Sequence, residues 1–253
     1  MKKALAFGRS FLLSPAKAAN ECADASAPVS ALIVYALTLL AAALFYRFKP
    51  YDFPDANAAV PMAPQGIFFW LKVMAWQPLL MAALIAFTGV LLRWVKDGWL
   101  PLKVATSFLW CAVPLILTVA FVKNGISKPV FGALMIVWAS PAVFVGRDIS
   151  KRDWLLLATF LLGLNAVELA AMLPEAVVTM MRWEAGYKAV VGLAGLWMLV
   201  GGALGLKHLP PHRPLPRALL PLLFALVLQI EVVIAAFMLG WLPVETLKAL
   251  LYG

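Results

Sequence analysis

The chain has 253 residues, of which 64% are hydrophobic and only 13% are charged. A soluble domain has about 45–50% apolar and about 25% charged residues, so the composition excludes an ordinary soluble globule. The mean hydropathy of +0.93 agrees with this exclusion, and we expect lipid to surround most of the chain. The net charge of +9 comes from 21 Lys and Arg against 12 Asp and Glu. Because the basic residues lie between apolar runs, they indicate contact with the lipid bilayer and its headgroups rather than with nucleic acid.

Seven stretches approach the length of about 20 apolar residues that a helix needs to cross the hydrocarbon of a bilayer. The sequence therefore predicts an all-α fold, a polytopic transmembrane helical bundle with short interfacial amphipathic helices. The predicted count is about seven spans, with five or six as alternatives. The spans are expected near residues 29–46, 78–95, 102–122, 129–146, 154–173, 187–206 and 216–241. No segment between them is long enough for a core of its own, so residues 29–253 are interpreted as a single membrane domain.

Residues 1–28 are interpreted as a cytoplasmic amphipathic segment. The pair Ser14 and Pro15 is typical of a helix cap followed by proline at the first helical position. The apolar residues 11–13 would then dip into the membrane interface, as in a surface-lying anchor. The alternative is a secretory signal peptide, which is disfavoured because Arg9 interrupts the required apolar core.

Proline and aromatic residues predict further short elements in chain order. The loop 49–64 contains four prolines and is expected to be extended. Residues 66–76 (GIFFWLKVMAW) are expected to form a helix at the outer interface, with an N-terminal extension of the second span as the alternative. Pro174 is expected to begin a new short helix with Glu175 in its first turn, where a carboxylate complements the helix dipole. Residues 243–252 are expected to form a short outer amphipathic helix.

The distribution of Lys and Arg predicts the orientation of the chain. With the N-terminus inside, thirteen basic residues fall on inner segments: Lys2, Lys3, Arg9, Lys17, Arg93, Lys96, Lys103, Arg147, Lys151, Arg152, Lys207, Arg213 and Arg217. The other eight fall on outer segments, and cytoplasmic loops accumulate basic residues. We therefore expect a bacterial inner-membrane protein with its N-terminus in the cytoplasm and its C-terminus outside. Expected partners are anionic lipids, through Lys2, Lys3, Arg9 and Lys17, and a second membrane protein.

Four polar residues inside the apolar runs are the candidate functional residues: Asn165 and Glu168 on the fifth span, and Gln229 and Glu231 on the seventh. Such residues usually face a cavity or a partner, because an exposed charge at mid-bilayer costs several kcal/mol. Asn165 and Glu168 share a helix face that Met172 continues, whereas Gln229 and Glu231 point in different directions. Two interpretations stay open: hydrogen bonds between helices with protonated carboxyls, or an ion or proton pathway.

No residue pattern predicts an enzyme, a cofactor or a metal centre. The sequence contains no HExxH, GxSxG, GxxxxGK[ST] or CxxC motif. The two histidines of 208–212 (HLPPH) have the spacing of helical metal ligands, but a helix cannot run through the two prolines between them. In the sixth span, small-residue spacing at Gly201 to Gly205 and at Gly195 to Leu199 predicts close helix packing.

Three patches of the sequence share a further similarity. They are residues 13–18 (LSPAKA), with an L-x-P-x-x-A pattern, residues 98–114 (GWLPLKVATSFLWCAVP), ending in an A-x-P, and the glycine-rich span with its basic loop at 192–217. Together they resemble the bacterial Yip-domain family, relatives of the Ypt/Rab-interacting membrane proteins of eukaryotes. That family usually has five spans, and residues 129–181 would add two, which preserves the orientation.

The resemblance implies a non-enzymatic integral membrane protein that takes part in membrane organisation, trafficking or partner recruitment. It assigns no site residue in this chain. The alternative function is a proton- or cation-coupled transporter or channel, in which Asn165, Glu168, Gln229 and Glu231 would form the relay.

Overall fold

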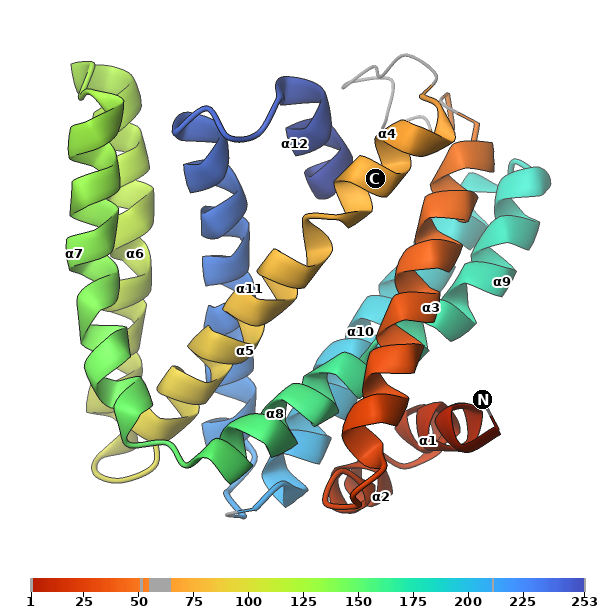
Figure 1. Cartoon of the computed structure of the whole chain (residues 1–253), viewed down its shortest axis with the longest axis horizontal. Coiled ribbons are helices and arrows are strands. Elements are labelled where there is room, and N and C mark those ends of the chain that lie inside the picture. The colour runs from red at the N-terminus through yellow and green to blue at the C-terminus, as the bar shows by residue number, and fades with distance from the viewer. Residues whose placement is uncertain (1, 51, 55–64, 211, 253) are drawn as a thin grey trace.

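The computed structural model describes residues 2–50, 52–54, 65–210 and 212–252, and within these ranges it is helical throughout, without strands. This confirms the predicted all-α fold. Twelve helices occur in these ranges (Figure 1): α1 Lys2–Leu13, α2 Pro15–Glu21, α3 Ala27–Phe48, α4 Ile67–Met74, α5 Gln77–Trp94, α6 Leu100–Asn124, α7 Lys128–Arg147, α8 Lys151–Leu164, α9 Ala166–Met180, α10 Glu184–His208, α11 Pro216–Met238 and α12 Val244–Tyr252.

Seven segments in the described part of the chain are long and apolar enough to cross a membrane, as predicted. Five of them are single helices, the second joins α4 to α5, and the fifth joins α8 to α9. The last predicted span extends three residues too far, since α11 ends at Met238 and Gly240 adopts a left-handed conformation with φ +82°. The fold therefore defines an α-helical membrane protein.

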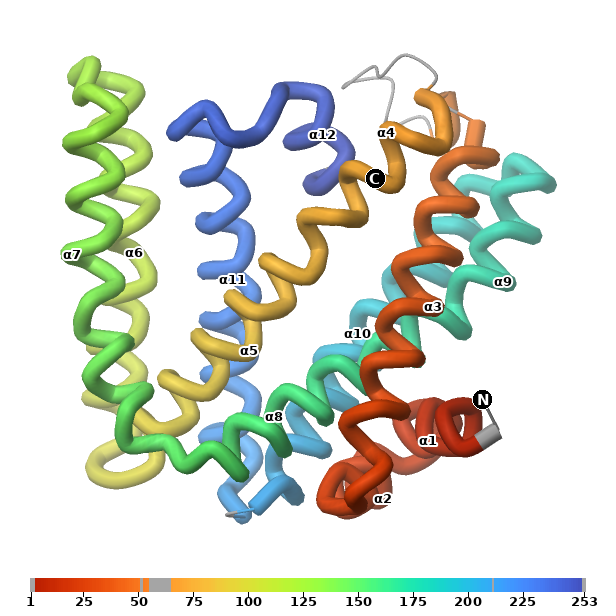
Figure 2. Tube along the Cα trace, viewed as in Figure 1, coloured from red at the N-terminus to blue at the C-terminus, as the bar shows by residue number. Residues whose placement is uncertain are grey.

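The bundle has two ends, which Figure 2 shows clearly. We call the end with α1, α2 and the connections after α5, α7 and α10 the N-terminal end. The opposite end, with α4, α12 and the connections after α6 and α9, is the C-terminal end. The two short helices α4 and α12 are in contact at the C-terminal end. A turn at Ala75 and Trp76 separates α4 from α5, so α4 is a distinct short helix as predicted, and it also extends the second candidate span, which runs from Ile67 to Trp94.

The fifth span breaks at Asn165 and not at Pro174. The Asn165 side chain donates hydrogen bonds to the carbonyl oxygens of Leu161 (3.0 Å) and Leu162 (3.1 Å), which ends α8. Helix α9 then continues through Pro174, so the prediction of a new helix beginning at Pro174 is wrong. A membrane helix tolerates an interior proline where neighbouring groups compensate for the lost hydrogen bond.

Helices α1 and α2 pack into the bundle. Helix α2 begins at Pro15 as predicted, with the Ser14 hydroxyl accepting a hydrogen bond from the backbone N–H of Lys17 (3.4 Å). Phe11 is fully buried against Phe160 of α8, with ring centroids 5.4 Å apart. The expectation that residues 11–13 face the membrane interface is therefore wrong for Phe11, whereas Leu13 is 68% exposed. Phe11 fits into the core because α8 has a glycine, Gly163, at its site.

Glycines allow this close packing at the N-terminal end. A Cβ atom on Gly163 would overlap the Phe11 ring, and one on Gly205 would overlap the Phe160 ring. The packing role predicted for Gly201 to Gly205 is confirmed, since Gly201 also lies against Pro15. The role predicted for Gly195 is wrong, because a Cβ there would meet nothing within 4 Å.

Candidate functional site: a polar seam between α3, α9 and α10

The predicted stripe on the fifth span is present and extends further than expected. Asn165, Glu168 and Met172 are followed on the same face of α9 by Glu175 and Thr179, because the spacing of three and four residues continues. Asn165, Met172 and Thr179 are buried, while Glu168 and Glu175 are half-buried. The stripe leads from the break at Asn165 to the C-terminal end of the bundle.

Helix α3 presents a matching stripe to α9. Tyr35, Thr38, Tyr46 and Lys49 recur at helical spacing, with Lys49 as the first residue after the helix. The Thr38 hydroxyl donates a hydrogen bond to the carbonyl oxygen of Asn165 (3.2 Å), which fixes the register of the two helices. Polar groups of α3 and α9 therefore face one another along half the length of the bundle.

Electrostatic interactions connect the two stripes and reach α10. Glu168 interacts with Tyr35 and Tyr46 on α3 and with Glu175, two stripe positions further along α9 and beyond Met172. Glu175 interacts in turn with Tyr46 and with Tyr187 at the start of α10. We call this set the polar seam; its members are Tyr35, Thr38, Tyr46, Lys49, Asn165, Glu168, Glu175 and Tyr187.

Lys49 supplies a positive charge to the seam. Its Nζ atom donates a hydrogen bond to the Tyr187 hydroxyl (3.1 Å) and lies 5.4 Å from the centroid of the Tyr46 ring. Burial lowers the pKa of Lys49 from 10.5 to about 8, and the Glu175 carboxylate offsets part of this change. The seam thus contains a cation whose protonation depends on a neighbouring carboxylate.

The seam is covered at the C-terminal end of the bundle. Arg182 forms an ion pair with Asp52, with 3.1 Å between the guanidinium and carboxylate atoms. The Phe53 ring lies edge-on against Tyr187, with centroids 5.4 Å apart. These contacts come from the loop predicted at 49–64, of which residues 51 and 55–64 lie outside the described part of the chain.

An apolar layer closes the seam on its other side. Beyond Asn165, toward the N-terminal end, the core includes Phe7, Phe11, Phe160 and Leu161, each at most 7% exposed, together with the buried hydroxyls of Ser10 and Thr159. The polar groups of the seam therefore stop near the middle of the bundle.

Glu231 lies outside the seam. It is 7% exposed on α11, and among the described residues its Oε2 atom has no hydrogen-bond partner. Gln229 is half-exposed on another face of the same helix. The structure therefore brings Asn165 and Glu168 together but does not unite them with Gln229 and Glu231, since the electrostatic partners of Glu168 lie on α3 and α9.

Sequence reasoning missed several members of the seam. Glu175 was assigned to the first turn of a separate helix, although its distance of seven residues from Glu168 is a signal for the same helical face. Lys49 is one of the eight basic residues that the charge count places on outer segments, with no signal for a role inside the bundle. Tyr46 and Tyr187 carry no local signal, because their roles depend on contacts between helices that are far apart in the sequence.

No metal centre occurs among the described residues, where no three His, Cys, Asp or Glu side chains come together. Helix α10 ends at His208, as the HLPPH sequence predicts. The rings of His208 and His212 lie 6.3 Å apart, centroid to centroid.

Comparison with known proteins identifies no relative: no family model, no curated protein and no solved structure matches the chain. The class of the protein therefore follows from its fold: it is an all-α protein with seven candidate membrane spans.

Proposed function

We propose that the chain is a non-enzymatic, multi-pass membrane protein that organises membranes or recruits a partner, as the resemblance to Yip-domain proteins implies. The observation that supports this proposal most strongly is the closure of the polar seam. A pathway for protons or ions needs polar groups or water across the hydrocarbon, whereas beyond Asn165 the core includes the fully buried and packed rings of Phe11 and Phe160.

The proposed location is a bacterial inner membrane, with the N-terminus in the cytoplasm and the C-terminus outside. The excess of basic residues on the predicted inner segments supports this orientation. At the N-terminal end, Arg217 donates hydrogen bonds to the carbonyl oxygens of Lys96 and Gly98, so two of the basic connections lie side by side.

The polar seam itself favours a second candidate, a proton- or cation-coupled transporter. Intramembrane carboxylates commonly mark ion pathways, and Glu168 and Glu175 lie in a seam that also contains Lys49. In this alternative the seam would be one half of a pathway, and rearrangement of the Phe11 layer would open the other half. Glu231 would act separately from the seam.

Flux measurements distinguish the two candidates. The full chain is reconstituted into liposomes that contain a pH-sensitive dye, and a pH gradient is imposed in the presence of Na⁺ or K⁺. We expect the wild type, Glu168→Gln and the matched control Glu231→Gln to show the same dye response as protein-free liposomes. Wild-type flux that is lost in Glu168→Gln and retained in Glu231→Gln, with helicity unchanged by circular dichroism, would overturn the scaffold proposal in favour of transport.

A further inference from the structure

A polar cavity of about 710 Å³ lies at the N-terminal end, between α1, α2 and the start of α3. Three basic side chains line it, from Lys3, Arg9 and Lys17, and two acidic ones, from Glu21 and Asp24. Four serines add hydroxyl groups to the lining. When the seven spans cross a bilayer, this end of the bundle lies at a membrane surface, at the level of the lipid headgroups.

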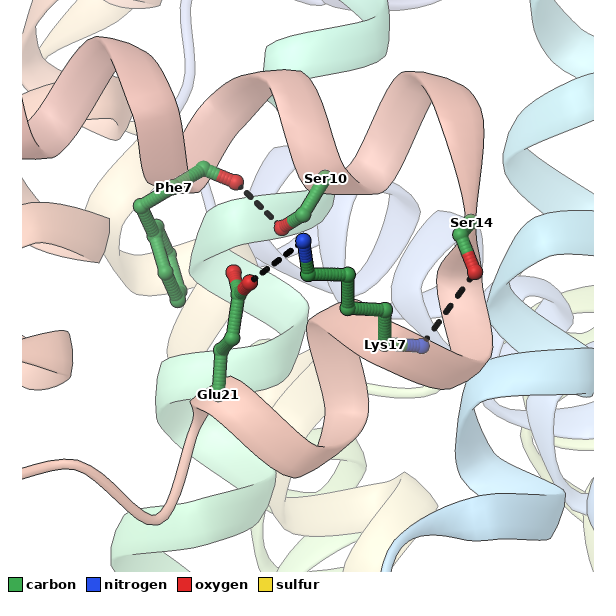
Figure 3. A network of polar contacts seen from close by, with 5 residues as sticks. All are labelled: Phe7, Ser10, Ser14, Lys17 and Glu21. Atoms are coloured by element: carbon green, nitrogen blue, oxygen red, sulfur yellow. Dashed lines mark hydrogen bonds and ion pairs between the residues drawn. The ribbon is translucent and has the colours of Figure 1, made fainter.

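The walls of the cavity are held by contacts within α1 and α2, which Figure 3 shows. The Ser10 hydroxyl donates a hydrogen bond to the carbonyl oxygen of Phe7 (2.6 Å). Ser14 caps α2 through the backbone N–H of Lys17, so the chain reverses direction between the two helices. Phe7 and Phe11 anchor α1 in the core. The charged side chains are therefore carried by helices that are docked on the bundle.

The charges of the cavity are only partly paired. Lys17 and Glu21 are 3.8 Å apart, and the Lys17 side chain is 71% exposed. An exposed ion pair of this kind contributes little to stability and is readily exchanged for another partner. Lys3, Arg9 and Asp24 form no ion pair with any residue that the structure describes. The cavity therefore offers both cationic and anionic groups to a ligand.

A second, apolar cavity of about 230 Å³ lies between α1, α3 and α9. Its lining includes Leu5, Leu12, Leu37 and Leu169, and Leu5 is 56% exposed on the outside of the bundle. The polar cavity, with two signs of charge, and the apolar cavity lie on opposite faces of α1, and Arg9 borders both. An amphiphilic ligand that occupies both would pass around α1 at this arginine.

We propose that α1 and α2 bind a phospholipid whose headgroup carries both a phosphate and a primary ammonium group, as in phosphatidylethanolamine. Arg9 and Lys3 would bind the phosphate, and Glu21 and Asp24 would bind the ammonium group. One acyl chain would lie in the apolar cavity between α1, α3 and α9. A purely anionic headgroup would offer no cation to Asp24, which has no ion pair among the described residues, or to Glu21, which pairs only with the exposed Lys17. A quaternary ammonium group has no N–H to donate to either carboxylate. The site is independent of the function proposed above, because lipid binding requires neither flux nor a protein partner.

Binding of short-chain lipids to the purified full chain in detergent tests the site, with native mass spectrometry as the readout. The probes are dihexanoyl phosphatidylethanolamine, the matching phosphatidylglycerol and phosphatidylcholine, glycerophosphoethanolamine without acyl chains, and inorganic phosphate. We expect the ethanolamine lipid to bind about ten-fold more tightly than the other two lipids, because only its headgroup donates charge-assisted hydrogen bonds from an ammonium group to the carboxylates. Glycerophosphoethanolamine should bind more weakly than the lipid. If it or inorganic phosphate binds as tightly, the ligand is a soluble phosphate compound and the lipid assignment is overturned.

Two variants locate the binding groups. Arg9→Gln should weaken binding of the ethanolamine lipid about ten-fold, whereas Arg147→Gln, which changes an exposed arginine at the same end of the bundle, should not. Glu21→Gln should abolish the preference for the ethanolamine lipid over phosphatidylglycerol. Equal effects of Arg9→Gln and Arg147→Gln, or a wild type that prefers phosphatidylglycerol, would show that only general attraction to anionic lipids operates. That outcome leaves the flux result unaffected, so the two proposals fail separately.

Discussion

Lys49 is the residue at which burial and charge oppose each other most directly. Its ammonium group lies between the Tyr46 and Tyr187 rings, at 5.4 and 5.1 Å from their centroids. Burial disfavours the charged form, and the Glu175 carboxylate favours it. The balance places the pKa of Lys49 at about 8, close enough to neutrality for a neighbouring substitution to change its charge.

We expect Glu175→Gln to lower the pKa of Lys49 further below about 8, because the substitution removes the favourable carboxylate. The pKa is followed by NMR of the reductively ¹³C-methylated protein, with Lys49→Arg to assign the signal. In the unfolded chain the lysine titrates near 10.5, so the unfolded state binds more protons between about pH 8 and 10.5. The contribution of Lys49 to stability therefore rises with pH across this window and is absent in Lys49→Gln. An upward shift of the signal in Glu175→Gln would contradict the assignment of the charge partner.

At the scale of secondary structure, the break between α8 and α9 determines where the polar seam begins. The Asn165 side chain donates hydrogen bonds to two carbonyl groups of the last turn of α8, and the backbone carbonyl oxygen of Asn165 accepts a hydrogen bond from the Thr38 hydroxyl. One residue thus ends a helix inside the bundle and joins that point to α3. Pro174 has no comparable role, because α9 passes through it.

Asn165→Leu should therefore destabilise the protein, whereas Pro174→Ala should not. Loss of the buried hydrogen bonds of Asn165 should lower the free energy of unfolding by about 1–3 kcal/mol. Replacement of Pro174 restores a backbone N–H to α9 and should leave stability unchanged or raise it. Unfolding of the purified protein in mixed micelles, monitored by circular dichroism, measures both. A larger loss for Pro174→Ala than for Asn165→Leu would place the structural break at the proline after all.

The helices were predictable from the sequence to a greater extent than the seam. The spans follow from uncharged runs such as residues 29–46, because hydrocarbon enforces helices of that length. Asn165 and Glu168 could be paired because they belong to one helix. Their partners could not, since Thr38 lies 127 residues from Asn165 and Lys49 lies 138 residues from Tyr187. The break at Asn165 was missed because propensity favours a break at proline, whereas the side-chain hydrogen bonds of asparagine decide it here.

At the scale of the whole molecule, an odd number of candidate spans predicts that the two termini lie on opposite sides of the membrane. Seven candidate spans occur in the described residues, and the α1 and α12 helices lie at opposite ends of the bundle. The two native cysteines are buried, and burial, with smaller contributions from Glu21 and Asp24, raises the pKa of the Cys22 thiol to about 12. Both native thiols should therefore react slowly with maleimides.

Single introduced cysteines can therefore report the topology. Asp97 and Asn124 are exposed at opposite ends of α6. In intact bacterial cells we expect a membrane-impermeant maleimide to label Asn124→Cys, and Asp97→Cys only after permeabilisation. The unmodified chain serves as the control for Cys22 and Cys111. Labelling of both introduced cysteines from one side would exclude a crossing by α6, and the reverse pattern would place the N-terminus outside.

The docking of α1 also constrains how the protein is made. Trp197 of α10 donates a hydrogen bond to the carbonyl oxygen of Phe11, across 186 residues of sequence (3.3 Å). At about 5–20 residues per second, a ribosome needs roughly ten to forty seconds to synthesise the chain between them. Helix α1 can therefore complete its contacts with α10 only after α10 has been synthesised.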